Sequence, residues 1–186
     1  YTKAHTRAED LRELALLDSL TGLQNRRAFR QSFKRAKARQ IRNRTPLCAM
    51  LLDLDHFKRI NDTYGHQVGD EVLVRLASVL TRELRGTDEV FRWGGEEFMV
   101  LLEETPGEHL ELVAERLRAA VEAEQLLDKS PITISIGATH ILPVEQDEVV
   151  YPRADEALYV SKRDGRNRVT IIDAPDSVRT SADFQP

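Results

Sequence analysis

The chain has almost none of the residues that would hold it together covalently or anchor it in a membrane. Its 186 residues include one cysteine, Cys48, so a disulfide framework is excluded. Cys48 lies in the apolar run 47–52, where we expect a small buried hydrophobic residue rather than a nucleophile. No run approaches the roughly 18 apolar residues of a membrane span, and no signal peptide follows the first residue, Tyr1. We expect a soluble fragment of a longer cytoplasmic protein that can carry an upstream sensory or membrane region.

A large excess of either charge is also missing. The chain has 27 basic and 31 acidic residues, which argues against binding of polymeric nucleic acid by the whole domain. The basic residues are unevenly placed, because residues 26–44 contain nine Lys or Arg and no acid. Phe29, Phe33 and Ile41 are interleaved with them. This pattern favours a solvated amphipathic helix over a polyanion-binding patch.

Hydrophobic spacing predicts strands alternating with helices. Asn25 is placed to cap the basic helix, which ends over 43–46. The later elements are predicted as a strand over 47–54, a helix opened by Gly69 and Asp70, strands over 90–93 and 98–102, a helix over about 107–124, a strand over 132–138, a helix over 154–163 and a strand over 169–172. Their order predicts an α+β fold with a ferredoxin-like βαββαβ core, in which helices cover one face of a central antiparallel sheet.

The two ends of the chain differ from this core. Ala4, Ala8, Leu11 and Ala15 follow a heptad-like spacing that predicts a helix over 1–17, although two heptads are too few to establish a coiled coil. Residues 18–173 are expected to form one domain. The tail over 174–186 is rich in Pro, Ser, Asp and Thr and is expected to be disordered.

The most informative segment is Gly94-Gly95-Glu96-Glu97, between two predicted strands. We expect the glycines to supply the positive φ angles of a tight hairpin and to let a ligand approach the backbone. The predicted fold places Asp53, at the end of a neighbouring strand, beside Glu96 and Glu97. Three converging carboxylates favour a hard divalent cation, Mg²⁺ above all, and with it a phosphorylated substrate. The alternative is a solvent-exposed sheet edge that binds nothing.

The residues after this strand offer contacts for a nucleotide. Residues 56–66 are expected to form a polar loop whose amides could bind phosphate. Asp70, just after this loop, could accept hydrogen bonds from N1 and N2 of guanine. Asn61, within the loop, could bind the rest of the base edge. Alternatively, Asp70 only caps a helix and Asn61 only shapes a turn.

Together these motifs resemble the GGDEF family, the diguanylate cyclases that join two GTP molecules into cyclic di-GMP. The resemblance covers about 18–173, with Glu96 where the family name has Asp. The matching segments are 18–23 with 25–27, 53–58 with 61–62, 65–70, 92–98, 135–137, and 154–159 with Lys162 and 165–167.

The resemblance implies a role for each matching position. Asp53 and Glu96 would bind Mg²⁺, with Mn²⁺ as an alternative, assisted by Glu97 and the carbonyl of Leu54. Either glutamate could instead be the base that deprotonates the 3′-hydroxyl, and the sequence leaves this open. Asn61 and Asp70 match the guanine-binding positions, and Lys162 and Arg166 those that hold the terminal phosphates. The other expected substrate-binding residues are Phe57, Lys58, His66, Gly94 and Gly95.

The resemblance also implies assembly and feedback. One domain holds one GTP, so two chains would form a homodimer of facing half-sites. Arg85 and Asp88 match the RxxD site at which the product inhibits, and Arg116 is a further candidate for that site. Two other functions stay open: a catalytically silent receptor for GTP or cyclic di-GMP, and a different metal-dependent nucleotidyltransferase, such as an adenylyl-type cyclase.

Overall fold

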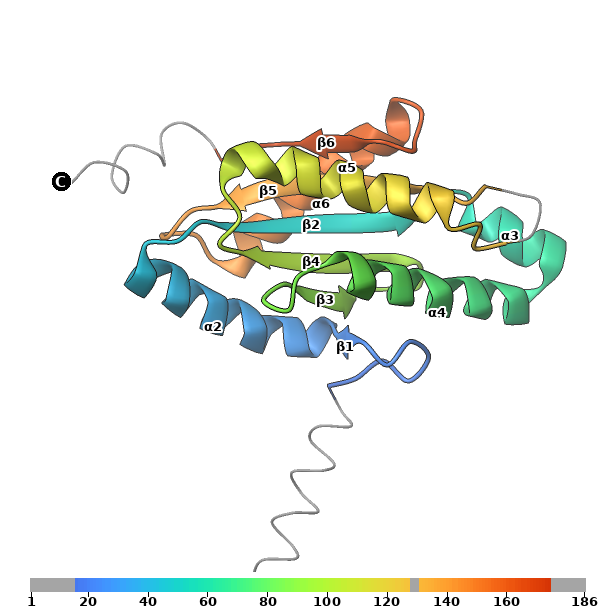
Figure 1. Cartoon of the computed structure of the whole chain (residues 1–186), viewed down its shortest axis with the longest axis horizontal. Helices are drawn as coiled ribbons and strands as arrows, with labels where there is room; N and C mark the ends of the chain where they lie inside the picture. The colour runs from blue at the N-terminus through green and yellow to red at the C-terminus, as the bar shows by residue number, and fades with distance from the viewer. Residues whose placement is uncertain (1–15, 128–130, 175–186) are drawn as a thin grey trace, which may run out of the picture.

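The computed structural model describes residues 16–127 and 131–174, which form one six-stranded sheet with helices packed against it (Figure 1). The strands are β1 (Gln24–Asn25), β2 (Leu47–Leu54), β3 (Glu89–Arg92), β4 (Glu97–Glu103), β5 (Ile134–Ile141) and β6 (Val169–Ile171). The helices are α2 (Arg26–Asn43), α3 (Phe57–Tyr64), α4 (His66–Glu83), α5 (Gly107–Ala123) and α6 (Asp147–Arg163). The predicted α+β class and the βαββαβ order of the core are confirmed.

The sheet has the order β1-β3-β4-β2-β5-β6 and is mixed. The central strand β2 pairs antiparallel with β4 and β5, and β3 pairs antiparallel with β4. The outer strands β1 and β6 each pair in parallel with their neighbours. The sequence predicted the antiparallel core and a strand at β6, but neither of the parallel pairings. Strand β1 was missed because it has two residues and leaves no pattern to read.

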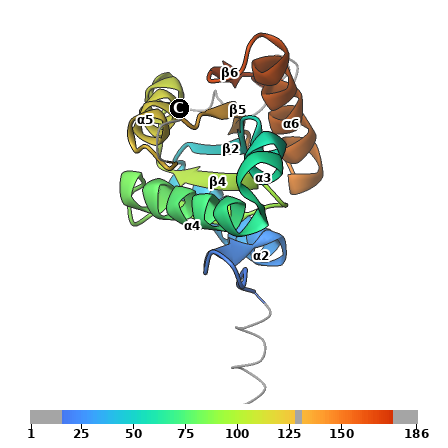
Figure 2. The same ribbon diagram turned by 90° about the vertical axis from the view of Figure 1, so that its right-hand side faces the viewer.

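Helices cover both faces of the sheet, so the prediction of one covered face was wrong. Cys48, Met50, Leu52 and Leu54 of β2 pack with α3, α4 and α5, while the alternate residues of β2 pack with α2 and α6. Figure 2 shows α4 and α5 on one side of the sheet and α6 on the other. All eight residues of β2 are buried, as a continuous apolar run requires. Cys48 is fully buried and burial raises its pKa to about 12, which confirms an inert core residue.

One helix was not predicted, and two others begin earlier than predicted. Residues 57–64 form α3 rather than a polar loop, because Phe57 and Ile60, one helical turn apart, are both buried. Gly65, with φ of 86°, separates α3 from α4, which therefore starts at His66 and not at Gly69. Helix α6 starts at residue 147 and contains Pro152, although proline predicts an interruption. The predictions for β2, β3, β4, α5 and β6 agree with the structure to within about two residues.

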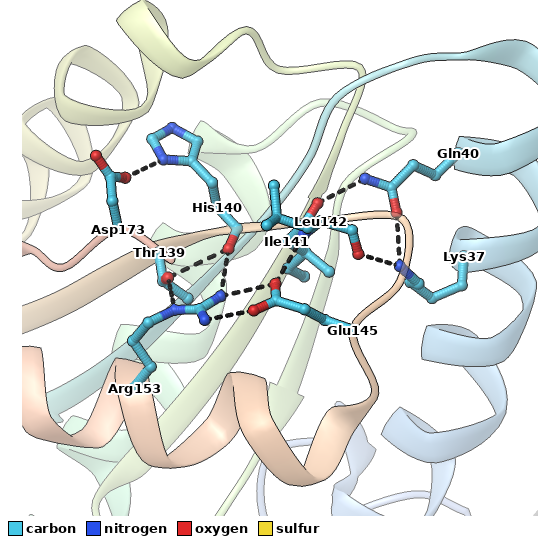
Figure 3. Close-up of polar contacts among 9 residues, drawn as sticks. All are labelled: Lys37, Gln40, Thr139, His140, Ile141, Leu142, Glu145, Arg153 and Asp173. Carbon is cyan, nitrogen blue, oxygen red and sulfur yellow. Dashed lines mark hydrogen bonds and ion pairs between the residues drawn. The ribbon is translucent and has the colours of Figure 1, made fainter. Parts of the chain in front are cut away.

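Helix α2 is amphipathic, as predicted. The Asn25 side chain caps it by accepting from the amides of the second and third helical residues, and Phe29 and Phe33 are buried. Polar side chains tie its far end to the end of β5 and the residue that follows it (Figure 3). Lys37 donates to the Leu142 carbonyl, and a neighbouring ion pair joins Arg153 to Glu145. This network lies at the end of the sheet where Leu47 pairs with Ile141. Asp53 lies near the other end of β2.

The predicted helix over 1–17 lies outside the described residues, apart from its last two. The predicted tail also lies outside them, apart from Ala174. Within 16–127 and 131–174, the structure has no helix that is both long and apolar enough to span a membrane.

Candidate active site

Acidic residues gather at the end of the sheet toward which β2 points. The β2–β4 register places Asp53 opposite Glu97, and the Leu54 amide donates to the Glu96 carbonyl at 3.3 Å. Asp53 is buried and the two glutamates are partly exposed. Burial, reinforced by the charge of Asp53, raises the pKa of both Glu96 and Glu97. The three acids therefore share one electrostatic environment.

A lysine from α6, on the face of the sheet that carries the Asp53 side chain, supplies positive charge to this cluster. The Lys162 ammonium lies 2.9 Å from Oδ2 of Asp53. Burial raises the pKa of Asp53, and the contact with Lys162 opposes that rise. In the described parts of the chain, no three His, Cys, Asp or Glu side chains are grouped closely enough to hold a metal ion. The tight three-carboxylate cluster that the sequence predicted is therefore absent from this arrangement.

The Gly94-Gly95 turn does not use positive φ angles. Among the described glycines, positive φ occurs at Gly22, Gly65 and Gly165, so this reason for Gly94 and Gly95 was wrong. The amides of Trp93 and Gly94 close the turn by donating to the Glu97 carbonyl at 2.8 and 3.3 Å. A Cβ on Gly94 would lie 3.0 Å from Oε2 of Glu97, whereas one on Gly95 would meet no atom within 4 Å. Gly94 thus leaves room for a carboxylate, and Gly95 exposes the backbone to solvent.

Arg92 holds this turn in place, a role that sequence reasoning missed. Its guanidinium donates to the Gly94 carbonyl at 2.6 Å and also to the Gly95 carbonyl. It also lies 3.6 Å from Asp18 Oδ2 and over the Phe98 ring. The only sequence signal was an arginine two residues before the glycines, on a strand. The hydrogen bonds from Arg92 limit movement of the backbone that carries Glu96 and Glu97.

Asn61 and Asp70 lie on adjacent helices. Oδ1 of Asn61 is buried and has no hydrogen-bond partner in the described structure. Asp70, in α4, directly follows Gly69 and lines a groove of about 400 Å³ together with Leu20. A buried amide oxygen without a donor is costly, so this position suits a ligand that carries N–H groups. His66 is the first residue of α4, and its side chain is exposed.

The start of α3 and the end of α6 offer positive charge. His56 precedes α3 in the left-handed region, with φ of 59°, and its side chain makes no cap hydrogen bond. The amides of Phe57 and Lys58 therefore lie in an uncapped first turn, a favourable place for an anion. Arg166 follows α6 and is exposed. Its charge, like that of Lys162, opposes the rise that burial causes in the pKa of Asp53, so both residues act on the same cluster.

Arg85 and Asp88 form a tight turn at the end of β3 remote from the glycine turn. The Asp88 amide donates to the Arg85 carbonyl at 3.0 Å, and the Arg85 amide donates to Oδ2 of Asp88 at 3.1 Å. Burial raises the pKa of Asp88, whereas the charges of Arg85 and Arg116 lower it. Oδ1 of Asp88 is buried, and the Glu103 backbone also lowers the pKa of this carboxyl.

Comparison with known proteins agrees with this geometry. The family model described as diguanylate cyclase, GGDEF domain, matches residues 15–168. The chain belongs to the GGDEF family. The GGDEF domain is 45% identical over 170 residues to diguanylate cyclase DgcP of Pseudomonas aeruginosa, covering 90% of this chain and 25% of that protein. It is 42% identical over 161 residues to DgcM of Escherichia coli K12, covering 87% and 39%. The chain thus spans a quarter to two fifths of these relatives.

Solved structures share the fold of this GGDEF domain. One contains the coiled coil and GGDEF domain of DgcB from Caulobacter crescentus in complex with c-di-GMP. It is 37% identical, with a TM-score of 0.84, over 92% of this chain and 93% of that one. Another is the active GGEEF domain of a diguanylate cyclase from Vibrio cholerae, 37% identical, with a TM-score of 0.75, over 81% and 98%. The similarity therefore extends over nearly the whole of each solved domain.

Proposed function

We propose that this GGDEF domain condenses two GTP molecules into cyclic di-GMP and two pyrophosphates. The observation that carries the proposal is the joint placement of Asp53, Glu96, Glu97 and Lys162 at one end of the sheet. The relatives named above are diguanylate cyclases, and the Vibrio cholerae domain that is called active carries the same Gly-Gly-Glu-Glu sequence as this chain.

The acidic cluster suits a divalent cation. Glu96 and Glu97 have pKa values raised by burial and by the charge of Asp53, and a bound cation would relieve both effects. Mg²⁺, or Mn²⁺ in its place, would be held by Asp53 and Glu96, with Glu97 and the Leu54 carbonyl assisting. When bound, the ion would stabilise charge on the α-phosphate during the reaction. Because Lys162 now lies against Asp53, binding of the metal requires the ammonium to move toward the phosphates.

The chain's own residues then bind and orient GTP. Asn61 and Asp70 hold the guanine, because the free Oδ1 of Asn61 and the carboxylate of Asp70 accept from its N–H groups. Lys162, Arg166 and the uncapped amides at the start of α3 hold the β- and γ-phosphates. The 3′-hydroxyl of the GTP on the facing chain attacks the α-phosphate in line with the departing pyrophosphate. Glu96 or Glu97 accepts its proton.

Two chains are needed because each domain binds one GTP. The active arrangement is therefore a homodimer in which two half-sites face each other across a two-fold axis. The heptad-like spacing over 1–17 suits a coiled coil that brings the domains together, and the similar DgcB structure contains a coiled coil. Formation of the homodimer would then control the rate of cyclic di-GMP synthesis.

The turn that contains Arg85 and Asp88 is proposed as a feedback site for cyclic di-GMP. Arg85 is exposed and can donate to guanine O6 and N7, while Asp88 can accept from N1 and N2 of a guanine. Arg116 on α5 donates to the Glu83 carbonyl at 2.9 Å, which places a second cation beside the turn. Binding of product here would slow further synthesis.

Incubation of the purified chain with Mg²⁺ and radiolabelled GTP or ATP, followed by separation of products, tests the proposal. We expect cyclic di-GMP from GTP, no product from ATP, and loss of product in Asp53→Asn. Binding of GTP without product would instead indicate a silent receptor. Conversion of ATP would indicate another nucleotidyltransferase.

A further inference from the structure

Asp55, two residues beyond Asp53, is a buried acid with no part in the site described so far. It is 5% exposed. Its Oδ1 accepts from the Ser135 hydroxyl at 2.6 Å, and its Oδ2 accepts from the Thr133 hydroxyl at 2.7 Å. Oδ2 also accepts from the backbone amide of Asn167 at 3.0 Å. Because both oxygens already accept hydrogen bonds from the protein, Asp55 is poorly placed to be a metal ligand.

The third of these bonds reaches the loop that presents Arg166. Gly165, Arg166 and Asn167 have φ angles of 118°, 63° and 46°, three consecutive residues in a region that L-residues rarely adopt. Such a backbone persists only where surrounding contacts fix it. The Arg166 amide donates to the Ser161 carbonyl at 2.9 Å, and the next amide, that of Asn167, donates to Asp55. Asp55 therefore holds the residue that directly follows Arg166.

The side chain of Asn167 ties the same loop to α5. Its Oδ1 accepts from Nη1 of Arg118 at 2.7 Å, and its Nδ2 donates to Glu122 at 2.9 Å. Arg118 is in turn oriented by Glu115 and Glu122 on its own helix. The loop is thus held from two sides: its backbone by Asp55, and its Asn167 side chain by α5.

We propose that Asp55, through the Asn167 amide, is a positioning residue that fixes the 165–167 loop so that Arg166 faces the terminal phosphates of GTP. The inference rests on the proposed function. Asp55 is two residues from Asp53 along the chain. The hydrogen bond from the Asn167 amide therefore fixes the position of the loop relative to the acidic cluster. Asp55 would act on the triphosphate through Arg166 and would touch neither guanine nor metal.

The test compares two guanine nucleotides that cannot be condensed. One is 3′-deoxy-GTP, which lacks the attacking hydroxyl, and the other is GMP, which lacks the terminal phosphates. Calorimetry should show that Asp55→Ala weakens 3′-deoxy-GTP binding about tenfold, the usual effect of losing one charge-assisted contact. Affinity for GMP should change by less than about twofold, because Asn61 and Asp70 are untouched. A general disruption of the domain would weaken both nucleotides equally and would overturn the proposal.

A double-mutant cycle separates action through Arg166 from a direct effect. If Asp55 works through Arg166, then Asp55→Ala combined with Arg166→Ala should bind 3′-deoxy-GTP within about twofold of Arg166→Ala alone. Additive losses would overturn the proposal. Arg82→Ala is the matched control, because Arg82 forms an arginine–carboxylate pair with Glu124 at 2.7 Å, between α4 and α5. It should bind both nucleotides as the wild type does.

Asp55→Asn keeps the test falsifiable if Asp55→Ala does not fold. Asparagine keeps the shape of the side chain, but it removes the charge that strengthens the bond from the Asn167 amide. We expect a smaller loss of 3′-deoxy-GTP affinity with unchanged GMP affinity, and unchanged affinity for both nucleotides would overturn the proposal. A wild type that binds neither nucleotide would overturn the proposed function together with this inference. A wild type that makes cyclic di-GMP while both variants keep full triphosphate affinity would overturn the inference alone.

Discussion

A Cβ atom on Gly69 would lie 1.9 Å from Oδ1 of Asn61. The absence of a side chain in the first turn of α4 therefore determines where the Asn61 amide can lie. The clash would fall on a side chain rather than on backbone, so an added methyl group displaces Asn61 instead of unfolding the helix. The missing side chain at Gly69 of α4 thus leaves the space that the Asn61 amide of α3 occupies.

We predict that Gly69→Ala weakens binding of 3′-deoxy-GTP by about tenfold, because it removes a buried hydrogen bond to guanine. Binding of 3′-deoxy-ATP, which cannot make this bond, should change little. Calorimetry measures both affinities, and Ser78→Ala is the control, since Ser78 is exposed on the same helix and its hydroxyl donates to the Val74 carbonyl. Equal loss for both nucleotides would count against a guanine-reading role for Asn61.

The acidic cluster should oppose stability when no metal is bound. Burial, then the charge of Asp53, raises the pKa of Glu96. A carboxyl group with a folded pKa above its unfolded value stabilises the fold at low pH, and this contribution is lost as pH rises through the folded pKa. Glu96→Gln should therefore raise the metal-free thermal midpoint at neutral pH, and the gain should shrink toward pH of about 4.

The same substitution should lower cyclic di-GMP synthesis by at least about a hundredfold, since it removes a carboxylate from the reaction centre. Differential scanning calorimetry from acid to neutral pH, with and without Mg²⁺, gives the stability comparison. The exposed Glu111 provides a control, and Glu111→Gln should change neither property. A Glu96→Gln midpoint below that of the wild type at neutral pH would contradict this account of the cluster.

Arg85→Ala should abolish the feedback site without harming the reaction centre. The lost contacts to guanine predict a decrease in cyclic di-GMP affinity of about tenfold or more. Product should then accumulate linearly for longer than in the wild type. Calorimetry with cyclic di-GMP tests this, with Arg42→Ala as an exposed arginine control on α2. Unchanged affinity in Arg85→Ala would remove the proposed site.

The parts of the fold that were predictable are those that a short stretch of sequence determines. The apolar run of β2 and the period of α5 are local patterns, and the Asn25 cap is a local contact. Helix α3 was missed because Phe57 and Ile60 become a buried pair only after α4 packs against them. Helix α6 was predicted to begin at Ala154, although buried residues on both sides of Pro152 carry the helix back to Asp147.

The residue types of the site and their roles were predictable from side-chain chemistry at the positions that match the family motifs. Asp55 shows where this stopped, because its partners Thr133, Ser135 and Asn167 lie 78, 80 and 112 residues away. No local spacing contains that information. The Lys162 contact with Asp53 joins β2 to α6 and was likewise not deducible before the sheet was assembled.

The central claim is that two chains together convert two GTP molecules into one cyclic di-GMP. The initial rate of cyclic di-GMP formation per chain, measured across a dilution series with Mg²⁺ and saturating GTP, tests it most directly. The account predicts a rate per chain that rises with protein concentration until the dimer is fully formed. A rate per chain that stays constant down through concentrations at which the chain is monomeric would contradict it.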